Sequence, residues 1–486
     1  MVDGAVVAAA AVAVHGRSVA FGFTGLDDRD LVVDDQPFLA APSSLWRVFG
    51  RAYMHVVDAG HAYWRPLVTW TLALDAQWSG ARPLGYHVTN VVLHAVGCVL
   101  VWALLRCLQL GPPVALATAL AFAVHPSLAS AVAWIPGRND TLLAVFALAS
   151  WIALLRGRTA VHLALFALAL LTKETAYALP LVWGAHAALL RVGPRGRALA
   201  LHAIAWVVLL GARILLHPAD ATLTLANASR LVSALGEIVL PVRLSVLADA
   251  RDVPVWPGVV AAVAVAAAVR FVPGVRTRVV AAGAAAFVLL LLPSVLLPGT
   301  LVVDSRLYLP AVGVAIALGE IAGALPFERR TVAAFAGAGV VALAVVTVAF
   351  ESSFRDRRAF ARDAVAGSPH SGMAHFCLGQ SAQLDGDDDL ALAEYQAALA
   401  LGPAEVVHND VAVLHMKHAR WPEAEQELRQ ELGLNPRYAR AYYNLGIVLR
   451  HEGRLGDACA AERDAVRLGA DDAATARERD RDCPTE

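Results

Sequence analysis

Long runs of apolar residues, about eleven in all, occur before residue 351 and are separated by short polar segments. They cover residues 4–22, 85–105, 113–133, 140–155, 159–172, 175–190, 198–216, 255–271, 279–299, 308–325 and 331–350. A helix of about 20 apolar residues crosses the roughly 30 Å of hydrocarbon in a bilayer. The pattern therefore predicts an all-α, polytopic membrane region with about eleven transmembrane helices.

The first apolar run is interrupted by Arg17, and a cleaved signal peptide is the alternative interpretation. The residues that follow its apolar part, "VHGRSVAFGF", lack the small-x-small pattern at which signal peptides are cut. We therefore expect this run to stay in the protein as a membrane helix.

After residue 350 the pattern becomes that of an ordinary soluble domain and repeats itself. Leu378, Gly379, Ala391 and Pro403 recur as Val411, Ala412, Ala424 and Pro436, and the first three recur again as Leu445, Gly446 and Ala458. A period near 34 residues with small residues at fixed positions is typical of tetratricopeptide repeats, which are paired helices. The sequence thus predicts a membrane domain at 1–350, a linker at 351–371, a C-terminal α-solenoid of three repeats at 372–471 and a polar tail at 472–486.

Basic residues in the short loops predict the orientation. If the N-terminus is cytoplasmic, the loops on that side contain Arg106, Arg156, Arg158, Arg191, Arg195, Arg197, Arg270, Arg276, Arg278, Arg329 and Arg330, and almost no acid apart from Glu328. This asymmetry is the one that the positive-inside rule describes. The loops at 23–84 and 217–254 and all residues beyond 350 then face outward. Within the second loop, residues 229–250 have apolar side chains at helical spacing, which predicts an amphipathic helix in the outer interface.

Composition agrees with a membrane protein and narrows the possible functions. Apolar residues make up 58% of the chain and charged residues 17%, with a mean hydropathy of +0.56. The net charge of −1 gives no indication of nucleic acid as a partner. The five cysteines lie far apart without metal-ligand spacing, so we expect neither a disulfide framework nor a metal site.

The first outer loop begins with an acidic pair, Asp27 and Asp28, directly after a membrane helix. A carboxylate beside a low-dielectric wall can have its pKa raised toward the range of a general base. The alternative is a solvated acidic loop, which is the common role of charge runs. Further polar features on the same side of the membrane favour the first interpretation.

A polar stripe, His87, Asn90 and His94, lies at spacing i, i+3, i+7 and so follows one face of a helix that enters the membrane. Such groups face either a cavity or a neighbouring helix. We expect them to line a substrate cavity, with helix–helix bonding as the open alternative. A histidine metal pair is disfavoured, because the two histidines are two turns apart and no carboxylate shares their face.

Several cations lie at outer helix ends, against the positive-inside trend. Arg138, Lys173 and Arg306 are predicted to hold a lipid phosphate, since Arg and Lys are the usual phosphate donors. The neighbouring polar residues predicted to line the cavity are Arg65, His125, Asp140 and Glu174. The alternative is that each cation pairs with the acid next to it in sequence: Arg138 with Asp140, Lys173 with Glu174, and Arg306 with Asp304.

Together these features predict a transferase that uses a lipid-phosphate-linked donor. A carboxylate would take the proton of an acceptor hydroxyl while cations hold the phosphate leaving group.

The ordered motifs "DDRDLVVDDQPFL", "WRPL", "GYHVTNVVLH", "AVAWIPGRND", "TKETAYALPLV" and "DSRLYLP", followed by the repeats, resemble the transmembrane and tetratricopeptide repeat-containing family. The resemblance implies the glycosyltransferase-C fold and inverting transfer of a sugar, mannose in the animal members. The donor would be a polyprenyl-phosphate sugar as co-substrate, without another cofactor, and the acceptor a protein hydroxyl on the non-cytoplasmic face.

Asp27 and Asp28 match the family's acidic pair and are the implied catalytic residues, whereas Asp34 and Asp35 resemble loop structure. Arg138, Lys173, Glu174 and Arg306 fall on matching motif positions. Ser130 departs from the family, whose members commonly have Glu there. For a bacterial-type member, the resemblance implies the inner membrane, with the site and the repeats in the periplasm and a protein or peptide acceptor bound through the repeats.

Two alternatives remain open from the sequence. The first is a non-enzymatic scaffold in which the helices only anchor the repeats in membrane lipid. The second is a ligase or polymerase for lipid-linked glycans with the same fold.

Overall fold

The protein is described by a computed structural model over residues 2–53, 63–191, 193–194, 196–216, 224–296, 301–302, 304–326, 328–402 and 406–468, and at residue 483. The chain forms two compact units, one comprising residues 1–53 and 63–363 and the other containing residues 364–486. The predicted polar tail lies outside the described residues except for Cys483.

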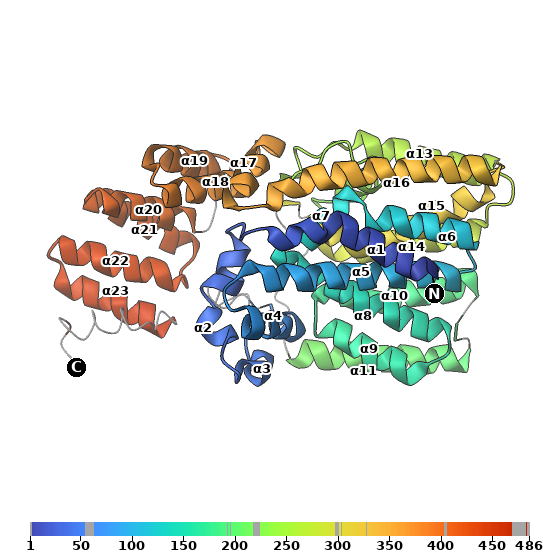
Figure 1. The fold of residues 1–486 in the computed structure, drawn as a ribbon. Coiled ribbons are helices and arrows are strands. Elements are labelled where there is room, and N and C mark those ends of the chain that lie inside the picture. The colour runs from blue at the N-terminus through green and yellow to red at the C-terminus, as the bar shows by residue number, and fades with distance from the viewer. Residues whose placement is uncertain are drawn as a thin grey trace. The chain divides into compact units, whose positions relative to one another are not determined.

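The first unit is helical. Its helices are α1 (Val2–His15), α2 (Gln36–Leu39), α3 (Ser44–Arg47), α4 (Pro66–Ser79), α5 (Pro83–Cys107), α6 (Pro112–Ala123), α7 (Ala129–Ala133), α8 (Arg138–Leu155), α9 (Thr159–Leu170), α10 (Leu179–Leu190), α11 (Arg197–Leu216), α12 (Arg230–Val239), α13 (Trp256–Phe271), α14 (Thr277–Val295), α15 (Tyr308–Ala324) and α16 (Arg329–Glu351) (Figure 1). Two strands of two residues each, β1 (Ala248–Asp249) and β2 (Leu301–Val302), pair antiparallel between them.

Among the described residues, 7 helices are long and apolar enough to cross a membrane, or 8 if the bent pair α6 and α7 is one span. The protein is therefore a multi-pass membrane protein. Every apolar run of the sequence contains a helix, but α9 and α10 have 12 residues each and α13 has 16. These three are too short to cross alone. The predicted number of about eleven spans is not confirmed.

The bent pair breaks after Ala123, within the apolar part of the chain, with an angle of 55°. A helix end inside a membrane leaves carbonyl groups that must find donors in the protein. Here His15 and His94 each place Nε2 on the Ala123 carbonyl, at 3.1 and 3.0 Å, and the Thr347 hydroxyl donates to the Val124 carbonyl at 2.6 Å. Three separate helices thereby satisfy the break.

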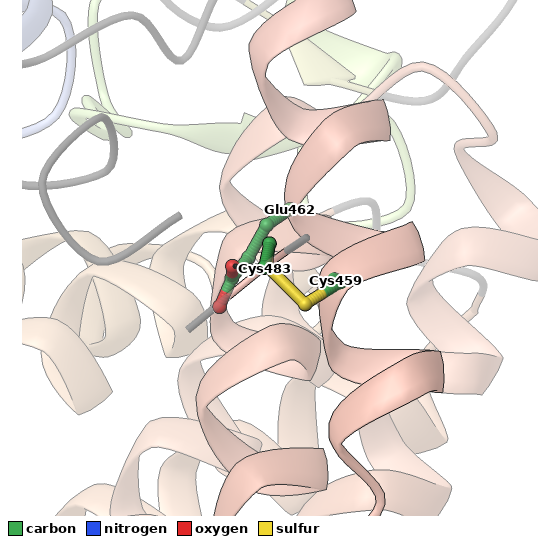
Figure 2. A group of neighbouring side chains, drawn as sticks. All are labelled: Cys459, Glu462 and Cys483. Atoms are coloured by element: carbon green, nitrogen blue, oxygen red, sulfur yellow. Dashed lines mark hydrogen bonds between the residues drawn. A yellow bond between two sulfur atoms is a disulfide. The ribbon is translucent and has the colours of Figure 1, made fainter. Parts of the chain in front are cut away.

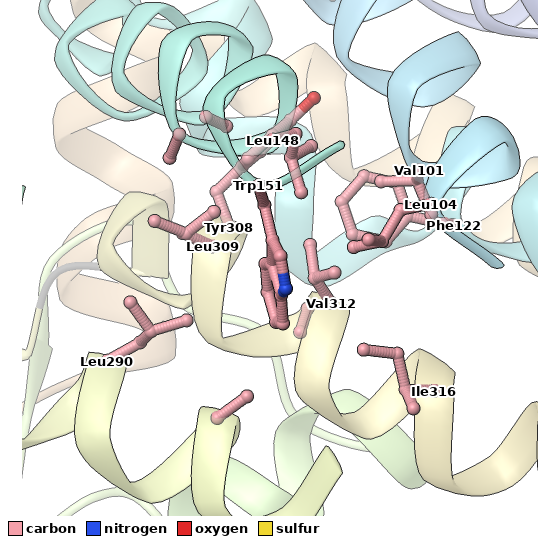
Figure 3. Packing of buried hydrophobic residues seen from close by; sticks show 14 of the residues in the cluster. Val101, Leu104, Phe122, Leu148, Trp151, Leu290, Tyr308, Leu309, Val312 and Ile316 are labelled. Carbon is pink, nitrogen blue, oxygen red and sulfur yellow. The ribbon is translucent and has the colours of Figure 1, made fainter. Parts of the chain in front are cut away.

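The apolar core joins helices from distant parts of the sequence. Trp151 of α8 is 1% exposed and packs in one cluster with Tyr308 and Val312 of α15 (Figure 3). Helices α14 and α15 cross closely at Gly283 and Gly313, where a Cβ on either would lie within 2.6 Å of the other helix. A larger side chain at either position would push the two helices apart.

The amphipathic helix predicted at 229–250 is shorter than expected and differs in its surroundings. Helix α12 ends at Val239, and its charged residues Arg230 and Glu237 are buried, where they form an ion pair. It packs on α13 through Gly258, where a Cβ would lie 1.7 Å from the Val232 carbonyl oxygen. The prediction of a helix whose polar face meets water is therefore wrong for these two residues.

The segment after the last membrane helix belongs to the first unit up to Asp363. The Gly22 amide, just before the acidic pair Asp27 and Asp28, donates to the Arg355 carbonyl at 2.8 Å. The ring of Phe360 lies 6.0 Å from that of Trp134. Helix α17 (Arg357–Gly367) then leads into the second unit.

The second unit consists of helix pairs with the spacing predicted for the repeats. They are α18 (Gly372–Asp385) with α19 (Asp388–Ala400), α20 (Val407–Lys417) with α21 (Trp421–Leu434), and α22 (Ala439–His451) with α23 (Leu455–Arg467). The repeated small residues allow close packing within a pair. A side chain in place of Gly379 would clash with Tyr395, since its Cβ would lie 2.5 Å away, and one in place of Gly446 would clash with Glu462 at 2.7 Å. This is the tetratricopeptide arrangement of antiparallel helices.

Candidate functional site

The two acids of the loop that follows α1, Asp27 and Asp28, occupy different surroundings. Asp28 is fully buried, and its Oδ2 accepts hydrogen bonds from the Thr24 amide at 2.7 Å and the Thr24 hydroxyl at 2.8 Å. Burial raises the pKa of Asp28 to about 7, while the two bonds from Thr24 lower it. Asp28 therefore fixes the turn that presents its neighbour.

Asp27 is half-buried and accepts no hydrogen bond or ion pair from any described residue. Burial raises the pKa of Asp27 to about 6, and the charges of Arg65 and Arg306 oppose that rise. Asp27 thus has the free carboxylate oxygens and the near-neutral pKa that a general base needs. Asp28 Oδ1 also has no partner among the described residues, but Asp28 is fully buried, so of the two predicted acids Asp27 is the one with exposed surface for contact with a ligand.

The cations near Asp27 come from three other helix ends. Arg65 precedes α4 and donates from Nε at 3.0 Å and Nη2 at 2.8 Å to Glu174 Oε2. Lys173, which follows α9, places Nζ 2.7 Å from Asp140 Oδ1. Arg306 lies in the short 3-10 helix before α15 and has no hydrogen-bond or ion-pair partner among the described residues.

The charges of this group interact electrostatically, and two ion pairs on the consecutive residues Lys173 and Glu174 hold part of it together. Burial lowers the pKa of Lys173; Asp140 raises it, and Arg65 and Arg306 lower it further. Burial raises the pKa of Glu174, but the guanidinium of Arg65 more than offsets this and leaves it below its usual value. The group therefore combines two paired cations with one unpaired cation beside an unpaired carboxylate.

Three comparisons with known proteins bear on this group. No protein-family model matches the chain. Over 86 residues it is 43% identical to Protein O-mannosyl-transferase Tmtc1 of Drosophila melanogaster, covering 18% of this chain and 10% of that protein. It is 32% identical over 159 residues to the human Protein O-mannosyl-transferase TMTC4, covering 29% and 21%. The chain is similar to TMTC-type proteins.

The matched part spans at most about a fifth of the TMTC-type relatives, with 21% the largest of these shares. A further match, to the human Protein O-mannosyl-transferase TMTC1, has 30% identity over 148 residues and covers 30% of this chain and 17% of that protein. Among solved structures, that of Pseudomonas aeruginosa PilF covers 24% of this chain and 55% of its own, at 28% identity and a TM-score of 0.23.

Arg138, predicted to hold the donor phosphate, is fully buried with protein partners on every side. Its Nη1 lies 2.6 Å from Asp75 Oδ2, its Nε donates to Asn90 Oδ1 at 2.9 Å and its Nη2 to the Tyr86 carbonyl at 2.7 Å. The guanidinium joins α4, α5 and α8 and has little capacity left for a ligand. Its structural role is to fix the start of α8.

The alternative of sequence-adjacent ion pairs is wrong. Arg138 pairs with Asp75, Lys173 with Asp140, and Glu174 with Arg65, while Asp304 lies 3.7 Å from Arg230. Each partner comes from another element of the fold. Arg306 is left without a carboxylate partner among the described residues.

Two residues of the polar stripe on α5, Asn90 and His94, bond other segments of the membrane region, while His87 Nε2 lies 3.4 Å from the Gly22 carbonyl and its Nδ1 has no partner among the described residues. His87, Asn90 and His94 are all fully buried. Asn90 Nδ2 donates to the Val132 and Trp134 carbonyls at 3.1 and 3.0 Å. The ring proton of His94 lies on Nε2, which donates to the Ala123 carbonyl at 3.0 Å. Nδ1 therefore accepts a hydrogen bond from the Tyr308 hydroxyl, at 2.8 Å. This arrangement favours the helix–helix alternative over a cavity lining.

Two further predicted positions lie in the bent segment that follows α6. His125 precedes a short 3-10 helix, and its Nδ1 accepts from the Ser127 amide at 3.3 Å. Ser130 of α7 is 2% exposed, and its hydroxyl has no hydrogen-bond partner in the described part of the chain. The His125 bond is local to this turn, whereas the structure shows no bonded role for the Ser130 hydroxyl.

The sequence reasoning missed Arg213, Tyr53 and Asn139. Arg213 lies in the apolar helix α11, 3.7 Å from Glu174, and a charged residue inside an apolar run was the available signal. Tyr53 and Asn139 carry no comparable signal, because a single Tyr in a loop or a single Asn at a helix start is common.

The described cysteines differ from the prediction in one respect. Cys459 of α23 and Cys483 form a disulfide (Figure 2). Their sulfurs and Glu462 could share a metal ion after reduction, since their ligand atoms lie within 4.8 Å of one another. Both Glu462 oxygens, however, accept from Arg450, at 2.6 and 2.7 Å. The expectation of no disulfide is wrong for this pair, which closes 24 residues of chain back onto the last repeat.

Proposed function

We propose that the protein is a glycosyltransferase that moves a mannose-like sugar from a polyprenyl phosphate to a hydroxyl of a protein acceptor. The observation that carries this proposal is a cluster of charged side chains, in which Arg65 pairs with Glu174 and the neighbouring Lys173 pairs with Asp140. Asp27 and Arg306 interact electrostatically with this cluster and with each other, and neither has a hydrogen-bond or ion-pair partner among the described residues. The names of the TMTC-type relatives support sugar transfer to protein.

In this mechanism Asp27 takes the proton from the acceptor hydroxyl as its oxygen attacks the anomeric carbon. The bond from that carbon to the phosphate oxygen breaks on the opposite face, so the configuration inverts. The leaving phosphate gains one negative charge, which Arg306 and Lys173 stabilise. Because Asp27 loses its own charge in the same step, the total charge of the site does not change.

Arg138 takes no part in donor binding in this proposal. Its bonds to α4 and α5 hold the first turn of α8, from which Asp140 pairs with Lys173. It is therefore a positioning residue, and Lys173 and Arg306 remain the proposed phosphate ligands.

The proposed location is a bacterial inner membrane, with the site and the repeats in the periplasm and a glycosyltransferase-C arrangement of the membrane helices. The excess of arginine in the opposite loops supports this orientation. The disulfide between Cys459 and Cys483 fits an oxidising compartment. The repeats would recruit the protein acceptor.

The test is glycoproteomics of a deletion strain complemented with wild-type protein, Asp27→Asn or Asp34→Asn. Asp34 is the matched control, because it lies on the same loop and pairs with Arg29 at 3.2 Å near the surface. We expect wild type and Asp34→Asn to restore hexose-modified peptides and Asp27→Asn to fail despite normal membrane levels. If deletion removes no glycopeptide, or if Asp27→Asn restores all of them, the proposal is wrong.

A further inference from the structure

Asn139 is the second residue of α8 and lies at the edge of the charged group, next to Asp140. Its side chain is only 8% exposed. Asn139 Nδ2 donates to the Tyr53 hydroxyl at 3.2 Å, and Oδ1 has no partner among the described residues. A tyrosine hydroxyl both donates and accepts, so either orientation of the amide makes this bond and leaves one polar amide group unpaired.

A buried amide group without a hydrogen-bond partner is unfavourable, because it has lost its bonds to water and has gained none in the protein. Other buried polar atoms of the described residues also lack a partner, among them Asp28 Oδ1, His87 Nδ1 and the Ser130 hydroxyl. Asn139 differs from the last two because its amide bonds Tyr53, whose ring lies under the Arg65 guanidinium. The unpaired half of Asn139 therefore indicates a position that a ligand can complete.

Tyr53 places this amide beside the reacting groups. The phenol is 6% exposed, and the Arg65 guanidinium lies over its ring at 5.1 Å and over that of Tyr63 at 4.6 Å. Burial raises the pKa of Tyr53; Arg65 lowers it, and the Asp27 carboxylate raises it. The phenol is thus neutral and within electrostatic reach of both the acid and the cations.

A neutral amide and a neutral phenol suit a neutral polar ligand. The cations account for the phosphate, and the carboxylate for the acceptor proton. The sugar must lie between them, since leaving group and attacking hydroxyl occupy opposite faces of the anomeric carbon. The amide can bond a hydroxyl whichever way it is turned, because a hydroxyl donates and accepts.

We propose that Asn139, held by Tyr53, binds a ring hydroxyl of the donor sugar and so contributes to the choice of sugar. This inference rests on the proposed function and names the sugar contact of the same site. A site built to bond a hydroxyl discriminates against the analogue that lacks it, because the buried group is then left unpaired.

The test compares polyprenyl-phosphate mannose with its four single deoxy analogues as donors, using the full chain in lipid nanodiscs. We expect one deoxy analogue to lower kcat/KM for the wild type about tenfold or more. Asn139→Ala should show a similar loss with the complete sugar and no additional loss with that one analogue. Tyr53→Phe removes only the hydroxyl that holds the amide, and it should weaken discrimination at the same sugar position.

Equal losses by Asn139→Ala with all five donors would mean a purely structural role and would overturn the inference, as would unchanged kinetics. If Asn139→Ala does not fold, Tyr53→Phe decides by the same pattern. Transfer by the wild type from none of the five donors would instead contradict the proposed function, so the two failures are distinguishable.

Discussion

The sharpest prediction concerns the pH at which the protein becomes active. Burial raises the pKa of Asp27 to about 6, and Arg65 and Arg306 limit that rise. A general base works in its ionised form, and with this pKa about 90% of Asp27 is ionised at pH 7 and about 10% at pH 5. Below pH 6, kcat/KM should fall by about tenfold for each pH unit.

Arg306→Gln should move this fall in kcat/KM at low pH, the acid limb of the pH profile, to higher pH. The substitution removes one of the two cations that lower the pKa of Asp27, so the carboxylate holds its proton more tightly. It also removes a proposed phosphate ligand, so KM for the donor should rise as well. Asp27→Asn should lower kcat by about 100- to 10,000-fold and abolish the limb.

The matched control is Arg29→Gln. Arg29 lies two residues from Asp27, but its guanidinium is half exposed and pairs with Asp34 at 3.2 Å. Water screens such a charge, so this variant should keep the wild-type limb.

The assay measures transfer of labelled mannose from polyprenyl phosphate to periplasmic proteins of the deletion strain between pH 5 and 8, with each variant in nanodiscs. An acid limb at the same pH in wild type and Arg306→Gln would refute the electrostatic reasoning. A wild-type rate in Asp27→Asn would refute the assignment of the base.

Two further predictions concern stability. Arg138→Met should lower the free energy of unfolding by about 3–5 kcal/mol, because Asp75 is then buried without its counter-charge. Adding Asp75→Leu should recover most of that loss in thermal unfolding of the solubilised protein, and a double variant no more stable than the single one would contradict this. Cys483→Ser should lower the stability of the last repeat by about 3 kcal/mol, because it opens a loop of 24 residues. Hydrogen exchange in α23 measures this loss. Exchange as slow as in the wild type would argue against it.

Local patterns predicted the elements of this fold well, because hydropathy and repeat spacing are properties of neighbouring residues. The apolar runs each contain a helix and the three helix pairs lie where the sequence places them, but α4 lies in a segment expected only as a loop and α12 ends earlier than expected. The number of spans could not be predicted, since an apolar run does not reveal where its helix ends: the run at 159–172 contains α9, which has only 12 residues and is too short to cross alone.

The candidate site was predicted less completely, because the partner of a charged residue depends on tertiary structure. Arg138 has the charge of a phosphate ligand, but Asp75 meets it from another helix. Arg65 binds Glu174 across 109 positions of sequence. Only the fold reveals that Arg306 is the cation left unpaired among the described residues, and no spacing rule distinguishes it from the others.

The bond between the Gly22 amide and the Arg355 carbonyl has a consequence for modularity. A shortened protein that stops at residue 350 would lose the acceptor that steadies the acidic turn, although all its apolar helices would be intact. One that stops after Asp363 would keep it. Residues 351–363 therefore belong to the membrane unit in structure, and a cut between the two units is best placed after Asp363.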